Sequence, residues 1–112
     1  MMQAWHELAD ELLLLQRELQ QLGLWSLQAP SAAALASREP FCVDTLAFEQ
    51  WLQWVFIPRM AQIVEQGQGM PGGCSIQPMG EEAFAHLGRQ AGDLLLILGR
   101  IDRVATRLAV QP

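Results

Sequence analysis

The chain has 112 residues, of which 51% are hydrophobic and 17% charged, and its formal net charge is -5. This length and apolar content predict a single domain, spanning residues 1–112, with one continuous core. The net negative charge, with Arg as every basic residue, disfavours direct binding to nucleic acid or to an anionic membrane.

Cysteine and histidine are few and widely separated. Cys42 and Cys74 lie outside any disulfide or zinc-binding spacing, and His6 and His86 are isolated from them. We therefore expect reduced thiols, no metal site and no cofactor. The start has no basic leader, and no apolar run is long enough to span a bilayer, so we expect a cytoplasmic protein.

The first predicted element is an amphipathic helix over residues 5–22. Its apolar residues recur at alternating steps of three and four, which is the spacing of one helical face: Trp5, Leu8, Leu12, Leu15, Leu19 and Leu22. Gly23 follows the last of them, where a left-handed residue would end the helix. Leu13 and Leu14 flank this stripe, so the helix has apolar surface for several neighbours or for a second copy of the chain.

Residues 26–41 contain two prolines and a run of small residues, which predicts a connection with at most a short turn of helix. Asp44 and Thr45 follow and offer side-chain oxygens that are typical of a helix N-cap. We therefore expect the next helix to begin just after them and to span residues 46–65.

That helix contains Pro58, and its apolar pattern changes there. On an ideal helical wheel the apolar residues before Pro58 share one face, and those after it fall largely on the other side. Proline removes the hydrogen bond to the carbonyl of Trp54, so we predict a kink between two half-helices that bury opposite sides. Such a helix would lie centrally, covered on both sides.

Residues 67–80 are rich in Gly and Pro and predict a loop. A short helix from Glu81 to about Arg89 is expected to follow, with Glu81 and Glu82 in its first turn. Asp93 then caps a last helix with a single apolar stripe from Leu94 to Leu108. The predicted fold is all-α: a four-helix bundle-like single domain with a kinked central helix.

The middle third of the chain resembles the YqcC-like family of small bacterial proteins. The resemblance rests on the string WLQWVFIPRM at residues 51–60, together with Pro40-Phe41, Asp44-Thr45, Met70-Pro71, Ile76-Gln77-Pro78-Met79 and Glu82. The flanking helices match only in pattern and length. This resemblance implies an all-helical cytoplasmic protein without an assigned activity, whose relatives are associated by name with tRNA pseudouridine synthase C.

That association raises the alternative of a pseudouridine synthase. The reaction is associated with a much larger, sheet-rich domain whose nucleophilic Asp lies in an Arg-Leu-Asp motif, whereas residues 107–109 here read Arg-Leu-Ala. No Ser or Cys has a legible His partner, and no Gly-rich loop opens a helix as a phosphate site would. We therefore predict no catalytic residues and a chain that is not an enzyme.

The first candidate site is a ligand or partner site around the two tryptophans of the predicted kinked helix. Its residues are Asp44, Thr45, Trp51, Trp54, Pro58, Arg59 and Glu82. The indole rings could stack on a planar ligand, with Arg59 supplying charge. The alternative is that both rings anchor the core and that Arg59 forms a structural ion pair with Asp44 or Glu82.

The second candidate site is a basic patch. Arg100, Arg103 and Arg107 share the exposed face of the last predicted helix, opposite in sign to the polar face of the first, which contains Glu7, Asp10, Glu11 and Glu18. The patch could bind a partner's acidic surface or an RNA backbone. Its alternative is a pair of ordinary solvated faces.

The leading functional hypothesis is a non-catalytic helical module accessory to tRNA pseudouridine synthesis. It would bind a protein partner or itself, as a homodimer. The alternatives are a small-ligand-binding domain at the first candidate site and the synthase activity.

Overall fold

The computed structural model describes residues 2–109, and every regular element in that range is helical. The helices are α1 (Met2–Gln21), α2 (Ala32–Leu35), α3 (Phe48–Trp51), α4 (Ile57–Gln66), α5 (Ile76–Ala83) and α6 (Gly92–Ala109). Three further segments have 3-10 or π-helical geometry, namely η1 (Pro40–Cys42), η2 (Leu52–Phe56) and η3 (Ala85–Ala91). The predicted all-α architecture is confirmed.

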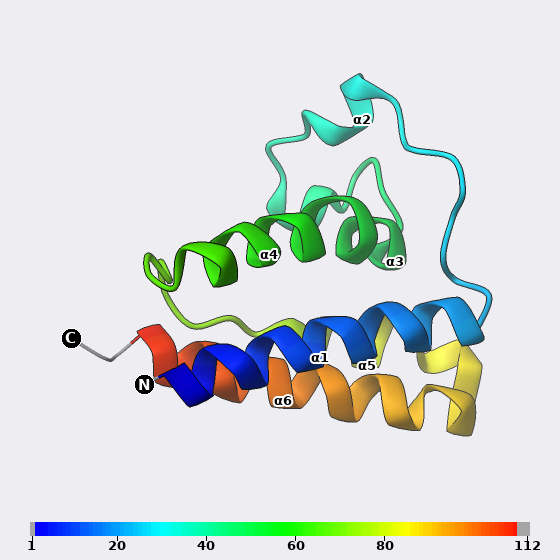
Figure 1. Ribbon diagram of the computed structural model, residues 1–112. Coiled ribbons are helices and arrows are strands. Elements are labelled where there is room, and N and C mark those ends of the chain that lie inside the picture. The colour runs from blue at the N-terminus through cyan, green and yellow to red at the C-terminus, as the bar shows by residue number, and fades with distance from the viewer. Residues whose placement is uncertain (1, 110–112) are drawn as a thin grey trace.

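Two long helices, α1 and α6, lie side by side and run in opposite directions, so the start of α1 and the end of α6 lie at the same end of the molecule (Figure 1). Their apolar stripes, which the sequence predicted, face each other and form the centre of the core, where the helix that contains Pro58 was expected. The buried residues of α1 include Leu8, Leu12, Leu15 and Leu19, and those of α6 include Leu94, Ile97, Leu98, Ile101, Val104 and Leu108. Each fully buried leucine contributes about 1.5–3 kcal/mol.

The run α3–η2–α4 is one helical rod across α1 that leaves α-helical geometry just before Pro58. Within it the N–H of Ile57 donates to the carbonyl of Leu52, five residues back, so η2 is a π-helical turn. The sequence predicted a kink at this place, and the structure has a π-helical turn immediately before Pro58.

The predicted change of buried face past Pro58 is wrong. One line of residues is buried along the whole rod: Phe48, Leu52, Phe56 and Met60. In a regular α-helix a four-residue step overshoots a turn by about 40°, so three such steps would turn this line by about 120°. The wider π turn takes up much of that drift. The change of face was predicted only because the helical wheel assumes a regular α-helix along the whole rod.

The rod is covered on both sides only in its first half. Gln53 is a polar residue of this rod but is buried, because its side-chain amide pairs with the backbone of Ser26 through two hydrogen bonds of 2.8 and 2.7 Å. Further along, Pro58, Arg59 and Gln62 of α4 are exposed. The connection from α1 therefore closes over η2, and α4 rests on α1 with its outer side open.

Asp44 and Thr45 do not cap the rod as predicted. The Thr45 hydroxyl donates to the carbonyl of Ala34 at 2.7 Å, and Asp44 accepts a hydrogen bond from Ser37 at 2.5 Å. Both side chains hold the short helix α2 in place, and that helix is the single turn expected in this connection. The start of α3 is stabilised instead by Gln50, whose side chain accepts from the N–H of Ala47 at 2.8 Å.

Helix α5 begins at Ile76, inside the segment that was predicted as a loop over 67–80. Pro78 is tolerated because it lies in the first helical turn, where a backbone N–H has no intrahelical partner. Gly80 is required for close packing on α6, because a Cβ atom there would lie 2.5 Å from Cδ1 of Leu98. Glu81 and Glu82 are consequently past the first turn, and both are exposed.

Among residues 2–109, no helix combines the length and the apolar character that a bilayer crossing requires.

Candidate functional site: the groove along α1 and α6

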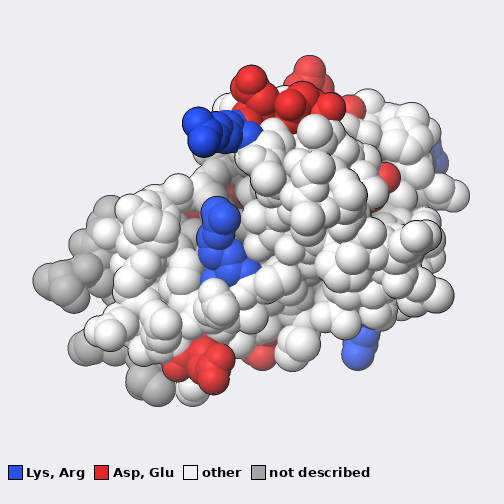
Figure 2. All heavy atoms as spheres, turned by 90° about the horizontal axis from the view of Figure 1, so that it is seen from above, with Lys and Arg blue, Asp and Glu red and all other residues white. Residues whose placement is uncertain are grey.

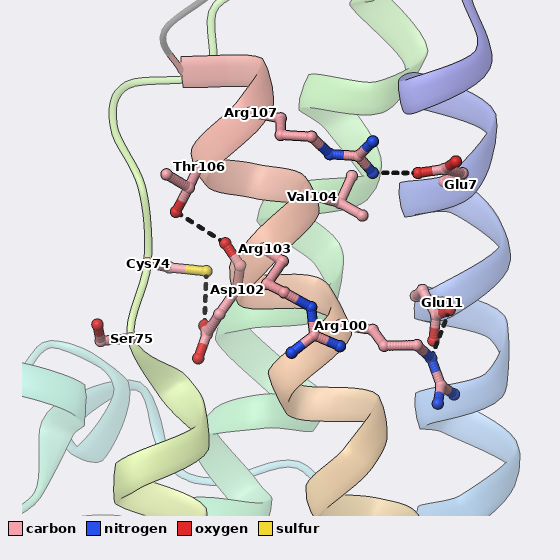
Figure 3. Close-up of a pocket in the computed structure, with 10 residues that line it drawn as sticks. All are labelled: Glu7, Glu11, Cys74, Ser75, Arg100, Asp102, Arg103, Val104, Thr106 and Arg107. Atoms are coloured by element: carbon pink, nitrogen blue, oxygen red, sulfur yellow. Dashed lines mark hydrogen bonds and ion pairs between the residues drawn. The ribbon is translucent and has the colours of Figure 1, made fainter.

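A groove of about 880 Å³ runs along the paired helices α1 and α6 and is bounded on its other side by the chain that leads into α5. Figure 3 shows α6 between α1 and this chain. The groove is lined by Glu7, Glu11, Cys74, Ser75, Arg100, Asp102, Arg103, Val104, Thr106 and Arg107. It thus contains all of the predicted basic patch. It also contains Glu7 and Glu11, two of the acidic residues on the polar face of α1.

Two of the three arginines are paired across the helices. Nε of Arg100 lies 2.8 Å from Oε2 of Glu11, and Arg107 forms a second ion pair with Glu7 (Figure 3). The two charged stripes therefore do not form separate surfaces, because the antiparallel packing of α1 and α6 joins them. The exposed Arg107–Glu7 pair contributes about 0–1 kcal/mol, and the Arg100–Glu11 pair is partly buried on the glutamate side. The clearer effect of both pairs is to hold the two guanidinium groups against α1.

Arg103 is different. It is exposed, it projects into the groove between its two paired neighbours (Figure 3), and no carboxylate within residues 2–109 forms an ion pair with it. The positive charge of Arg103 is therefore the part of the predicted basic patch that is left for another molecule.

Asp102, the carboxylate next to Arg103 in sequence, is engaged elsewhere. Its two oxygens accept hydrogen bonds from the N–H groups of Ile76 and Gln77, at 2.8 and 2.9 Å, and from the thiol of Cys74 at 3.1 Å. A carboxylate in this position satisfies backbone donors at the start of α5 and interacts favourably with the helix dipole. Asp102 is thus an N-cap supplied by a different helix.

The Cys74 thiol is correspondingly unreactive. Burial, followed by the hydrogen bond to Asp102 and the negative charge of that carboxylate, raises the pKa of Cys74 from 9.0 to about 12. The thiol therefore stays protonated near neutral pH and is a poor nucleophile.

Sequence reasoning missed both Cys74 and Asp102. One local signal was present: Ser75, a common N-cap residue, stands before Ile76, and Pro78 lies within the following turn. This pattern could have predicted the start of α5. It could not have identified Asp102 as the acceptor, because α6 is remote in sequence.

The other candidate site, around the tryptophans, is not assembled as one site. Trp51 stacks on Phe48 with ring centroids 5.7 Å apart and contacts Phe41 and Phe56, so it belongs to an aromatic cluster at the edge of the core. Trp54 is half-buried, and its indole Nε1 is buried without a hydrogen-bond partner among the described residues. The position of Trp51 favours its interpretation as a core anchor, whereas Trp54 is not among the residues that pack against the core.

The remaining members of that site are dispersed. Arg59 is exposed on α4 and forms no ion pair with Asp44 or Glu82 within the described range, so the predicted structural ion pair is wrong. Asp44 is bonded to Ser37 instead. Neither the groove nor a smaller pocket of about 330 Å³ beside Trp5 and Met70 is lined by any residue of this set.

The molecular surface on the side of α2 and α4 has a different character from the groove. In Figure 2, which views the molecule from that side, most of the surface is neither acidic nor basic. The groove instead combines paired charges with one cation left over. Within residues 2–109 no cluster of three His, Cys, Asp or Glu side chains could hold a metal ion.

Comparison with known proteins gives the chain a family. A family model described as tRNA pseudouridine synthase C matches residues 7–104. The chain belongs to this family. The match includes most of both groove helices and every groove-lining residue except Thr106 and Arg107.

The fold is that of a YqcC protein, which confirms the resemblance seen in the sequence. The solution NMR structure of YqcC from Escherichia coli superposes with a TM-score of 0.83 at 28% identity, over 97% of this chain and 93% of that chain. In sequence, Escherichia coli YqcC, described as uncharacterized, is 35% identical over 78 residues, which are 70% of this chain and 72% of that protein.

Two further relatives match over shorter segments. An uncharacterized protein of Haemophilus influenzae is 51% identical over 70 residues, which are 62% of this chain and 66% of that protein. A protein of Pectobacterium carotovorum named tRNA pseudouridine synthase C is 39% identical over 57 residues, which are 51% of this chain. That segment is only 15% of the Pectobacterium protein, so most of the named synthase lies outside the match.

Proposed function

We propose that the chain is a non-catalytic helical module that binds a protein partner, and that this partner is a tRNA pseudouridine synthase. The observation that supports a binding role best is the surface of α1 and α6. On the faces of α1 and α6 that contain the groove's charged residues, Leu14 and Leu96 are exposed by 39 and 57% of their surface. Apolar side chains next to an uncompensated charge are typical of a surface that a partner covers.

The choice of partner rests on the Pectobacterium relative. There a segment similar to this chain shares one polypeptide with a much longer sequence that is named tRNA pseudouridine synthase C. A shared polypeptide holds two parts at high effective concentration. Where the parts are separate chains, as proposed here, a specific interface would have to replace that linkage. Because the proposed partner acts on tRNA, we also propose that the complex is cytoplasmic.

The groove offers little support for catalysis by this chain itself. Asp102 is occupied by three donors, and the Cys74 thiol is held in its protonated form. A nucleophilic carboxylate or thiolate must be free and ionised to attack. Neither group meets this requirement, which is why we propose an accessory role.

Self-association is the second candidate function, and the same exposed leucines favour it. A homodimer would bury them against their own copies in an isologous contact. Light scattering on the purified chain between micromolar and millimolar concentration separates the two candidates, because only a homodimer doubles the mass without a partner.

The proposed function is tested with two purified proteins from one organism, this chain and its tRNA pseudouridine synthase C. We expect a complex of defined stoichiometry in size-exclusion chromatography with light scattering. We also expect pseudouridine in unmodified tRNA with the synthase and none with this chain alone. Pseudouridine formed by this chain alone, or separate elution of the two proteins at micromolar concentration, would contradict the proposal.

A further inference from the structure

The three groove arginines have unequal roles that follow from their spacing on α6. Arg100 and Arg107 lie on either side of Arg103 along one face of the helix and are both held by carboxylates of α1. Their pairing removes them as competitors for an incoming anion. Arg103 alone offers a planar fork of N–H donors to the groove.

The groove suits one carboxylate better than a chain of phosphates. A guanidinium binds a single carboxylate in a bidentate manner. A nucleic acid would need further cations along the groove for its successive phosphates, but Arg100 and Arg107 are already paired with carboxylates of α1, and the net charge of -5 would oppose it as well. A single acidic side chain needs only the one unpaired cation, Arg103.

Two exposed leucines, Leu14 and Leu96, lie at one end of the groove, at a defined distance from Arg103. Leu14 lies one turn beyond Glu11 on α1, and Leu96 lies one turn before Arg100 on α6. The Glu11–Arg100 pair sets the register of the two helices, so both exposed leucines lie at the same end of the groove. Leu96 and Arg103 are seven residues apart on α6, which corresponds to about 10.5 Å.

From this arrangement we infer that the groove is the docking site for an amphipathic helix of a protein partner. That helix presents an Asp or Glu to Arg103 and, seven residues away, a large apolar side chain to Leu14 and Leu96. Two residues seven apart on a helix lying along α6 have the same separation as Leu96 and Arg103, so both contacts form at once. This inference rests on the proposed function and adds the chemistry of the partner.

The first test measures affinity for the tRNA pseudouridine synthase C by titration calorimetry. We expect Arg103→Gln and Leu96→Ser each to weaken binding about tenfold or more, and Arg103→Lys to weaken it less. Arg89→Gln is the matched control, because Arg89 is also exposed and lies outside the groove. Binding by Arg103→Gln and Leu96→Ser at the affinity of the parent chain would overturn the inference while leaving the proposed function standing.

The second test does not depend on the synthase. The probe is a capped helical peptide of about 16 residues, long enough to be partly helical alone, with one Glu and one Leu seven residues apart. Its twin has Gln in place of Glu. We expect backbone amide shifts at Leu96 and Arg103 on titration with the Glu peptide, and binding about tenfold weaker for the Gln twin.

Three outcomes of the second test would overturn the inference. Equal binding of the two peptides would remove the role of the carboxylate. Arg103-dependent binding of poly(U) RNA, tighter than that of the Glu peptide, would make RNA the occupant. A concentration-dependent dimer that Leu96→Ser abolishes would make a second copy of this chain the occupant. Peptide binding without synthase binding would support the groove and contradict the proposed partner.

Discussion

The carboxylate of Asp102 holds the N–H of Ile76 at 2.8 Å, which joins the last helix to the start of α5. The same carboxylate accepts from the N–H of Gln77 and from the thiol of Cys74. One side chain on α6 therefore caps the start of a helix that lies far from it in sequence, and it also holds the chain before that helix, which forms one wall of the groove. The shape of the proposed docking site depends on this contact.

Replacing Asp102 tests that dependence. We expect Asp102→Asn to lower the free energy of unfolding by about 1–2 kcal/mol, because the amide has a single acceptor oxygen and no charge to offer the helix N-terminus. Urea unfolding measures the effect. Asp10→Asn is the control, since Asp10 is exposed and makes no hydrogen bond within the described residues. An equal loss of stability in both variants would contradict the capping role.

The raised pKa of Cys74 predicts a loss of stability at alkaline pH. The folded thiol has a pKa of about 12 against 9.0 ordinarily, so the unfolded chain releases its proton first. Its contribution to stability is fully present below pH 9 and is lost as the pH rises from 9 to 12. The chain has neither Tyr nor Lys, so few other groups titrate in this window.

The measurement is the urea midpoint at several pH values across this window, for the parent chain and for Cys74→Ser. The serine hydroxyl can still donate to Asp102 but does not titrate. We expect the midpoint of the parent chain to fall more steeply with pH than that of Cys74→Ser. Parallel curves for the two proteins would show that the thiol has an ordinary pKa in the fold.

Gln53 is predicted to be essential for closing the α1 connection over the rod. We expect Gln53→Leu to lower the free energy of unfolding by about 1–3 kcal/mol, because the N–H and carbonyl of Ser26 lose their partners. Thermal or urea unfolding followed by circular dichroism measures the loss. Gln62→Leu, at an exposed position of the same rod, should stay within about 0.5 kcal/mol of the parent chain.

A substitution of Arg59 distinguishes between the two candidate binding sites. Because it is exposed and unpaired among the described residues, we expect Arg59→Ala to change stability by no more than about 0.5 kcal/mol. It should also leave the affinity for the synthase unchanged, in contrast to Arg103→Gln. A loss of affinity for Arg59→Ala alone would move the binding site to the outer side of α4.

The sequence determined the helices whose apolar residues repeat at helical spacing. The predicted apolar stripes are buried, with Leu8, Leu12, Leu15 and Leu19 in α1 and the stripe that begins at Leu94 and ends at Leu108 in α6. They could be predicted because the period of one helical face is a local property. The same reasoning placed Arg100, Arg103 and Arg107 on one exposed face. It failed between Phe48 and Met60, since a π turn changes the period and its position follows from packing against the rest of the molecule.

Only the tertiary structure decided which charges remain free. The partners of Arg100 and Arg107 lie 89 and 100 residues away, and the donors to Asp102 lie 25 to 28 residues away. Contacts over such separations depend on the register of packed helices, which no local pattern encodes. Arg103 stands out within its stripe because the register of α1 against α6 gives carboxylates to its two neighbours and none to it.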